Sequence, residues 1–345
     1  MTGDVSVKAL AIKGERFDAV KSRFDMRRLA TGPEGKIRAD TQSKYGPIAL
    51  HTDALMIEDV LRLSAIRFDG AGATLEGAVS VPVGGAPMTG EIRFKAEKLQ
   101  TLLKIAGVAG DGQGSGRVEL SAGNGRQRAT ATLDIVDIRI AAATAGERMR
   151  AKRLAVKAAS DDLFAAQQLS LTIDIGKATA GDVSFDTISL QAKGSPARAE
   201  IGVKAAGRWI DPLVVDASFV FSGKGDRYDI QAAKLSGETL GRKFSIQRPF
   251  RLQWDKARMI LKDFAFAFGD AQATASATLT GAAVEGTIAL TEWPLATLDR
   301  LWSSGLAGTM SGTATLQGTR AKPRGTLMLE IPKLRLASEP EIAAF

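Results

Sequence analysis

Apolar and polar residues alternate with a period of two along most of this chain. The alternation is clear in residues 169–175, 213–221 and 264–268, where Leu, Ile, Val or Phe stands at every second position. Successive side chains of a β-strand point to opposite faces of the sheet, so this pattern predicts strands with one apolar and one polar face. The chain is therefore expected to build sheets that bury or shelter only one side.

Turn residues divide the pattern into strand-length pieces. Residues 48–57, 61–68 and 74–83 are separated by short polar or glycine-rich links, and the sequence Gly-Gly-Ala-Pro at 84–87 predicts a turn. Further turn signals are Gly176, Gly181, Gly194, Gly223, Gly225 and Gly241. Strands that recur every 8 to 12 residues are typical of an all-β protein.

One stretch of the pattern occurs twice. Residues 286–336 align without a gap on residues 90–140, and fourteen of the 51 positions are identical, where unrelated segments of this composition would give about four or five. Each copy reads as a strand, a short amphipathic helix, a glycine-marked strand and a turn into another strand. The helices are expected at 99–106 and 294–302, with Pro294 at the first helical position of the second copy. A third short helix is predicted to begin at 160–164.

A repeat changes the expected architecture, because a compact sandwich would not restart its own sequence. We therefore predict an all-β fold made of an elongated, curled antiparallel sheet with a few short amphipathic helices. The segments are a strand region at 1–89, the first repeat module at 90–140, a continuing strand region at 141–285, the second module at 286–336 and a tail at 337–345. Both ends resemble cuts through a longer repetitive protein.

The composition and charge of the chain limit the classes of function that it can have. The chain has 345 residues, 45% hydrophobic residues, no cysteine, one histidine and a formal net charge of +8. The absence of cysteine excludes disulfides, thiolate metal sites and cysteine nucleophiles. The basic residues are scattered, with small clusters such as 148–153, so the charge does not favour nucleic-acid binding. No run approaches the roughly 18 to 20 apolar residues that cross a bilayer, and residues 1–7 open directly into a strand pattern.

The candidate catalytic groups do not form a recognisable site. His51 is interpreted as a solvated strand residue, and Asp137, Asp161 and Asp162 have no matched acid or base partner in the sequence. The glycine run at 107–116 fits neither a dinucleotide-binding nor a phosphate-loop pattern, so it is interpreted as a flexible turn after the first short helix. We expect no catalytic residues, no metal site and no cofactor, and hence no enzyme.

The repeat carries a family resemblance. Its Gly-x-Ile-x-Leu strand at 286–290, its Leu-x-x-Leu helix at 295–298 and its Gly-Thr-x-x-Leu-x-Gly-Thr-x-x-x-Pro link at 312–323 resemble the TamB and AsmA-like family of the translocation and assembly module. Residues 188–194 and 234–269 look similar to that family as well. The resemblance implies a long β-taco with a hydrophobic interior in the periplasm of a diderm bacterium. It also implies a membrane anchor and a C-terminal domain, neither of which we expect within these 345 residues.

What the resemblance implies about function is transport of phospholipid between inner and outer membranes during outer-membrane biogenesis, with an Omp85-type outer-membrane barrel as a further partner. The full-length protein would be anchored in the inner membrane. Acyl chains would lie in an apolar groove, held by burial worth about 0.8 kcal/mol per methylene. The residues expected to line that groove are Leu171, Ile173, Phe219, Phe221, Phe264, Phe266, Phe268, Ile288, Leu290, Leu327 and Leu329.

Two other interpretations stay open at this point. The apolar alternation can form the dry core of two packed sheets, as in a surface adhesin. The chain can be a scaffold that holds an unfolded outer-membrane strand by edge pairing. The choice of strand face is itself unsettled where the alternation shifts phase, as between Ile135 and Val136.

Overall fold

A computed structural model describes the chain except for residues 13–14, 29–31, 44, 106, 142–147, 165–167, 196, 296, 298–305, 333 and 337–345. The chain divides into two compact units, residues 1–181 and 182–345. This division falls inside the strand region predicted at 141–285. Each unit is described by itself below.

The first unit consists of eleven strands and one helix among its described residues. These are β1 (Thr2–Ile12), β2 (Glu15–Arg27), β3 (Glu34–Ser43), β4 (Gly46–Ile57), β5 (Val60–Gly70), β6 (Ala73–Pro82), β7 (Thr89–Ala96), α1 (Gln100–Ile105), β8 (Gly110–Gly123), β9 (Arg126–Ala141), β10 (Arg148–Ser160) and β11 (Leu169–Ala180).

The second unit contains only strands in its described residues, apart from a fragment of helical turn near Leu295. These are β12 (Val183–Ser195), β13 (Arg198–Trp209), β14 (Asp211–Lys224), β15 (Arg227–Thr239), β16 (Arg242–Ile246), β17 (Phe250–Trp254), β18 (Arg258–Phe268), β19 (Ala271–Thr280), β20 (Ala283–Pro294), β21 (Leu306–Ala307), β22 (Thr309–Thr319), β23 (Lys322–Glu330) and β24 (Arg335–Leu336).

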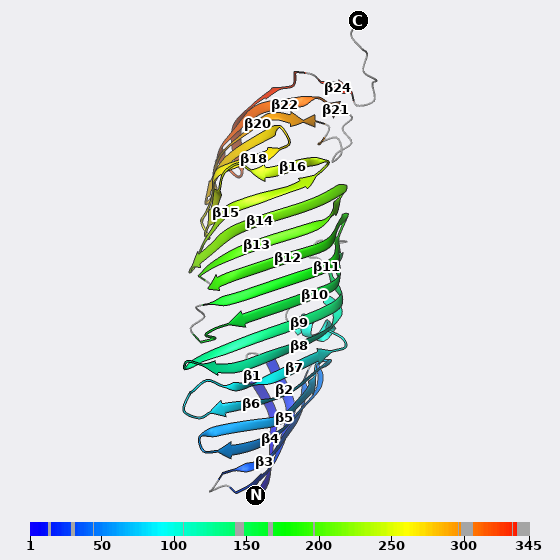
Figure 1. The fold of residues 1–345 in the computed structure, drawn as a ribbon, viewed down its shortest axis with the longest axis vertical. Helices are drawn as coiled ribbons and strands as arrows, with labels where there is room; N and C mark the ends of the chain where they lie inside the picture. Colours follow the sequence, from blue (N-terminus) through cyan, green and yellow to red (C-terminus); the bar gives the residue numbers. More distant parts are fainter. Residues whose placement is uncertain are drawn as a thin grey trace. The chain divides into compact units, whose positions relative to one another are not determined.

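The sheet of each unit grows by adding one strand after another in chain order. In the first unit β1 to β11 pair in sequence, each antiparallel to the next (Figure 1). The second unit follows the same rule, with β16 and β17 sharing the space between β15 and β18. The short strands β21 and β24 pair separately. The predicted all-β fold of curled antiparallel sheet is therefore confirmed.

The short elements match the sequence predictions only in part. The helix predicted at 99–106 is confirmed as α1, whereas the one predicted at 294–302 falls mostly outside the described residues. The helix predicted at 160–164 is wrong. There the carboxylate of Asp162 accepts a hydrogen bond from the Phe164 N–H at 3.2 Å, and the Leu163 N–H bonds to the Gln127 carbonyl at 2.7 Å. A side chain that bonds its own backbone favours a turn over a helix. The turn predicted at Gly176 is also wrong, because β11 continues through it.

The strand register keeps the apolar side chains on one face of each sheet. Where the alternation slips, one strand carries an extra residue in a β-bulge. Ala65, Asp263 and Glu292 are such residues, and each has a positive φ between 49° and 59°. The bulge at Ala65 brings Leu63 and Ile66 to the same side, although they are three residues apart. A bulge also bends the strand and increases its twist.

The predicted phase shift near Ile135 and Val136 lies at such an irregularity. The pairing of β8 with β9 is interrupted there, and Asp137 has a φ of 52°. Ile135 lies opposite Gly114 before the interruption, and Ile140 lies opposite Gly110 after it. Both isoleucines therefore stay on the face against which α1 packs.

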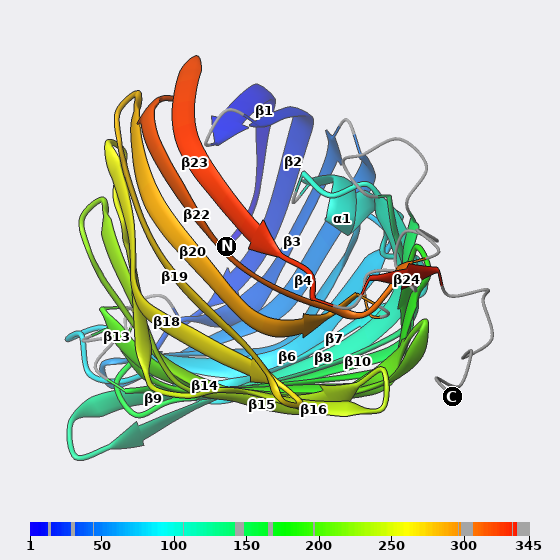
Figure 2. The same cartoon turned by 90° about the horizontal axis from the view of Figure 1, so that it is seen from above.

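The strands bend along their length, so each sheet is curled (Figure 2). Glycines on the apolar face permit this close approach of neighbouring backbones. A Cβ at Gly77 would collide with the Glu91 carbonyl, one at Gly207 with the Ser184 carbonyl, and one at Gly237 with the Val214 carbonyl and the ring of Phe244. These positions therefore accept only glycine without movement of the backbone.

Helix α1 lies against the apolar face of the first unit. Leu99, just before it, is 5% exposed and packs with Ala73 and Ala96, and Leu102 and Leu103 pack against that cluster. A helix of six residues cannot hold its structure alone in water, so this contact stabilises it. Figure 2 shows α1 on the inside of the curl, which identifies the apolar face of this unit as the concave one.

The glycine run at 107–116 is mostly strand, which corrects the prediction of a flexible turn. Residues from Gly110 onward belong to β8. A Cβ at Gly114 would lie 3.3 Å from Cδ1 of Leu99, and one at Gly110 would lie 3.1 Å from Cδ1 of Leu103. The glycines therefore leave room for the α1 segment on the sheet.

The same backbone hydrogen bond occurs within each of the two repeat copies. The Leu99 N–H donates to the Gly112 carbonyl at 2.8 Å, and the Leu295 N–H donates to the Gly308 carbonyl at 2.9 Å. These positions correspond in the alignment of 90–140 with 286–336, and both leucines are 5% exposed. The repeat seen in the sequence thus recurs as the same local contact in each unit.

The crowding at Gly237 predicts a large effect of a single methyl group. Gly237→Ala should lower the free energy of unfolding by about 2 kcal/mol or more, because the new Cβ forces the backbone or the Phe244 ring to move. The matched control is Gly202→Ala on β13, where no atom lies within 4 Å of the new Cβ and φ is not positive. Thermal and urea denaturation of both variants would measure the difference, and equal stability would contradict this account of the bend.

Candidate functional site

The candidate site is the apolar face that the strands of each unit share. The register places all eleven residues predicted to line a groove on that face of their own unit. Leu171 and Ile173 lie opposite Ala158 and Val156 in the first unit. The other nine belong to the second unit, where for example Phe219 lies opposite Ile201 and Leu327 lies opposite Ala314.

Much of this face is not covered by other described residues of the chain. In the described part of the chain, each strand makes its main contacts with its ladder neighbours, and α1 is the element that packs on a sheet face. Large apolar side chains consequently remain accessible: Ile288 is 52% exposed, Leu327 66%, Leu329 50% and Met149 50%. Two sheets packed face to face would have buried these residues, so the described residues do not form the dry core of a sandwich.

In the second unit aromatic rings from neighbouring strands touch across the apolar face. Tyr228 stacks on Phe221 with ring centroids 6.0 Å apart and on Trp254 at 5.3 Å. A second group joins Phe250, Phe264, Phe266 and Phe244 at centroid distances of 5.2 to 6.1 Å. Such contacts add about 0.5–1.5 kcal/mol per pair beyond their buried area.

Phe268 differs from the other predicted lining residues. It is 4% exposed, and its ring stacks on Trp293 at 5.9 Å. It therefore packs within the protein and offers little surface to a ligand. Trp293 lies opposite Met310 on the same face, beside Phe268.

Sequence reasoning missed several members of this aromatic surface, namely Tyr228, Phe244, Phe250, Trp254 and Trp293. Each lies on a short strand or near a strand end, where too few residues alternate to define a face. The pairing of β15 with both β16 and β17 brings Tyr228, Phe244, Phe250 and Trp254 onto neighbouring strands, and nothing in the local sequence indicates that branching. The sequence signal that could have indicated this surface is the group of three aromatic residues, Phe244, Phe250 and Trp254, within residues 244–254.

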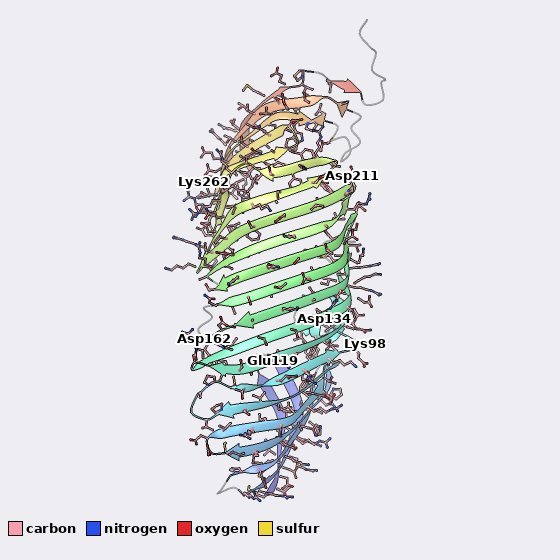
Figure 3. The ribbon with its side chains drawn as sticks, viewed as in Figure 1. Lys98, Glu119, Asp134, Asp162, Asp211 and Lys262 are labelled. Atoms are coloured by element: carbon pink, nitrogen blue, oxygen red, sulfur yellow. The ribbon has the colours of Figure 1, made fainter. Side chains whose placement is uncertain are left out.

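The opposite face is polar and carries cross-strand ion pairs. In the first unit Arg23 pairs with Asp4 at 2.8 Å, Arg67 with Glu76 at 3.5 Å and Arg153 with Asp134 at 2.6 Å. Glu91 accepts hydrogen bonds from Arg93 and Arg117, and the bond from Arg93 leads the effects that lower its pKa. Glu119 on β8 and Asp134 on the neighbouring strand β9 are labelled in Figure 3. Exposed pairs of this kind contribute little each.

The other groups considered for catalysis do not converge. His51 lies on the polar face between Arg38 and Arg67 of the adjacent strands. Asp137 occupies the irregularity in β9, while Asp161 and Asp162 lie in the turn after β10. Within the described residues no group of three or more His, Asp or Glu side chains could hold a metal ion. No helix in that part of the chain is both long and apolar enough to cross a bilayer.

A cavity among the described residues lies elsewhere. It has a volume of about 930 Å³ and is bordered by hairpin ends and polar residues of the first unit, including Tyr45, Asp69 and Lys95. None of the eleven predicted residues lines it. The candidate site is thus an open surface rather than an enclosed pocket.

One ion pair supports the aromatic surface from behind. Asp229 lies on the polar face of β15, 18% exposed, and accepts hydrogen bonds from Arg251 at 2.6 Å and from Gln253 at 2.7 Å. Its neighbours Tyr228 and Trp254 stack on the other face of the same two strands. Burial alone would raise the pKa of Asp229, but the bonds from Arg251 and Gln253 outweigh it and lower the pKa.

Because the pKa of Asp229 is lowered in the folded state, its ionised carboxylate stabilises the fold at pH values above the ordinary Asp pKa, near 3.9. This stabilisation is lost as the pH falls through the pKa that Asp229 has in the folded protein. Asp229→Asn should cost about 0.5–1 kcal/mol at pH 7, a modest amount because Arg251 is exposed. The difference from the parent protein should shrink below about pH 4. Asp226→Asn, at the exposed pair with Lys256, is the control and should change stability little. Urea unfolding monitored by tryptophan fluorescence measures both, and a pH-independent difference would contradict the assignment.

Comparison of the chain with models of known protein families and with curated proteins found no match.

Proposed function

We propose that this protein is a non-enzymatic lipid conduit whose apolar sheet face binds the acyl chains of phospholipids. The observation that carries the proposal is the uncovered apolar face. Ile288 on β20 and Leu327 on β23 lie in one row across the sheet, both opposite Ala314 of β22, and both are more than half exposed. Contiguous apolar surface of this kind marks a binding surface for an apolar partner.

Acyl chains suit this surface for two physical reasons. Burying a methylene contributes about 0.8 kcal/mol, so a chain gains free energy along any part of the face without a specific pocket. The lining changes little in character from strand to strand, with Val, Ile, Leu, Phe and Ala at successive positions. Many similar shallow contacts allow a chain to move along the surface without being trapped at one place.

The resemblance to the TamB and AsmA-like family supports the wider setting of this proposal. Under this proposal the protein works in the periplasm of a diderm bacterium and moves phospholipid between the inner and outer membranes during outer-membrane biogenesis. In that setting the full-length protein is anchored in the inner membrane, and an Omp85-type barrel is a partner. The lipid head groups stay in water at the open side of the curled sheet.

A second candidate function rests on the edge of the second unit. Strand β23 pairs with β22, and all nine of its residues are exposed. An exposed edge strand can add a strand from another chain by main-chain hydrogen bonds. In this alternative the protein holds an outer-membrane strand during assembly.

The face-specific test uses the double variant Ile288→Asp with Leu327→Asp. Two carboxylates in the middle of the apolar row should reduce phospholipid that co-purifies with the protein at least fivefold, since charge is not tolerated next to hydrocarbon. The matched control is Thr287→Asp with Met328→Asp, which places the same charges on the neighbouring positions of the polar face; Met328 is 70% exposed. Mass spectrometry of extracted lipid is the measurement, with melting temperatures to verify folding.

The two candidate functions give different results in this comparison. A conduit loses lipid in the apolar-face variant and keeps it in the polar-face variant. A scaffold that pairs through its main chain responds equally to both variants, because Leu327 and Met328 are adjacent in the edge strand. Absence of phospholipid from the parent protein would refute the conduit.

A further inference from the structure

The hairpin turns of the second unit gather basic residues along one rim of its sheet. Neighbouring strands are antiparallel, so the turns alternate between the two ends of the strands (Figure 1). The described residues of the turns at one end include seven basic and two acidic side chains, and all seven basic ones are exposed. We call this row of turns the basic rim; it consists of residues 195–198, 224–227, 255–258, 280–283 and 319–322.

The two acidic residues of the basic rim offset only part of its charge. The Asp226 carboxylate pairs with Lys256 of the neighbouring turn at 2.7 Å. The Asp255 carboxylate accepts hydrogen bonds from the N–H groups of Ala257 and Arg258, inside its own turn, at 2.8 and 2.9 Å. The basic rim therefore carries a surplus of positive charge.

The turns at the other end of the same strands carry no such surplus. The three hairpin turns described there, at 209–211, 239–242 and 268–271, contain one arginine and two aspartates. One of these aspartates, Asp211, is labelled in Figure 3. Basic residues that are scattered in the sequence are thus collected by the strand order on one rim of this unit.

Apolar side chains lie one residue inward from the basic rim, on the apolar face. Tyr228 follows Arg227 in the chain, Met259 follows Arg258, and both lie opposite Trp254. The rings of Tyr228 and Trp254 stack with centroids 5.3 Å apart. Tyr228 is 38% exposed and Met259 44% exposed. Two aromatic rings and a methionine therefore directly adjoin the most basic turns.

A rim of this kind presents both faces of the sheet to a flat surface at once. A strand advances about 3.3 Å per residue, so the apolar side chains lie only about that far behind the turns. Lysine and arginine side chains can reach the phosphate groups of a bilayer, and tyrosine and tryptophan favour the boundary between head groups and hydrocarbon. No single lipid has to contact both faces, because different lipids of the bilayer lie on each side of the rim.

We propose that the basic rim docks on the surface of a membrane that contains anionic phospholipid. Such membranes attract clusters of basic residues, and binding grows with the apolar area that enters the interface. Nucleic acid is also anionic, but a reader of single strands offers aromatic faces on which bases stack. Here Tyr228 and Trp254 stack on each other beside an exposed methionine, which favours a bilayer.

Docking in this way sets the apolar face of the second unit beside the bilayer. Lipid could then pass between the bilayer and that face without crossing open water. This consequence rests on the proposed function, whereas the docking itself does not. The two can therefore fail separately.

The test compares two triple variants that remove the same charge. The rim variant is Lys224→Gln with Arg227→Gln and Arg258→Gln. The control is Lys204→Gln with Lys243→Gln and Lys262→Gln, three exposed lysines of the polar face, of which Lys262 is labelled in Figure 3. Co-sedimentation with vesicles of phosphatidylcholine, with and without phosphatidylglycerol, measures binding, and melting temperatures verify that both variants fold.

The parent protein should bind the vesicles that contain phosphatidylglycerol and bind phosphatidylcholine alone much more weakly. The rim variant should lose about tenfold or more of this binding, because each basic residue at an anionic surface raises affinity several-fold. The control should stay within about twofold. Binding should also weaken between about 0.01 M and about 0.15 M salt, as the Debye length falls from about 30 Å to about 8 Å.

Three outcomes overturn the proposal. A parent protein that does not bind anionic vesicles has no docking rim, and equal losses in the two triple variants show that net charge alone decides binding. A single-stranded oligonucleotide that displaces the protein from vesicles, and whose binding depends on the same three residues, identifies a nucleic-acid surface. If the rim variant alone loses vesicle binding and the parent protein carries no co-purified phospholipid, the rim stands and the conduit fails.

Tryptophan fluorescence tests the apolar part of the contact. Vesicles of phosphatidylglycerol with brominated acyl chains should quench the emission of the parent protein, and Trp254→Phe should remove most of that quenching. The matched control is Trp209→Phe, since Trp209 is 40% exposed in a turn of the opposite rim. Salt that releases the protein from the vesicles should restore the emission. Quenching that is lost in the control, or that persists after release because lipid was extracted, contradicts docking through this rim.

Discussion

Hydrogen bonding between neighbouring strands is the interaction on which both sheets depend. Backbone donors and acceptors pair along antiparallel ladders, so the sheets hold together without a second layer packed upon them. This leaves the hydrophobic surface only partly buried, and few large side chains are fully enclosed. The constraint that follows is simple: a sheet with one apolar side must be curled, partly covered or occupied by something apolar.

The curl relies on local devices at particular residues. Bulges at Ala65, Asp263 and Glu292 keep the apolar side chains on one face while bending the strands. Glycines such as Gly77 and Gly237 allow neighbouring backbones to approach more closely than a Cβ would permit. Aromatic contacts around Tyr228 and Phe266 in the second unit and the helix α1 in the first then cover part of the apolar face. Function and stability compete here, because every ring that packs against a neighbour is surface withdrawn from a ligand.

The period-two pattern is the reason the sequence could predict the fold class, and it is also why the eleven residues predicted to line a groove share the apolar face of their own unit; that they line a groove stays a prediction. Alternation within one strand needs no tertiary information, and the antiparallel register then aligns strands such as β20 and β22. The failures arose where the decisive contact is remote. In the sequence Gly110 and Gly114 are typical loop residues, and only the structure shows that Leu103 and Leu99 pack over them. The aromatic surface needed the branched pairing of β15.

The strictly sequential pairing has a consequence for how such a chain acquires its structure. Each strand of the first unit contacts the strand made just before it, so loops are closed over short separations and the entropic cost of bringing partners together stays small. Low contact order of this kind favours rapid assembly by addition of hairpins to an existing edge. It also means that inserting or deleting a hairpin lengthens or shortens the sheet while leaving distant pairings intact, as in repeat proteins. Duplication of a segment can therefore change the number of strands in such a sheet during evolution. The similar sequences at 90–140 and 286–336 are what such a duplication would leave.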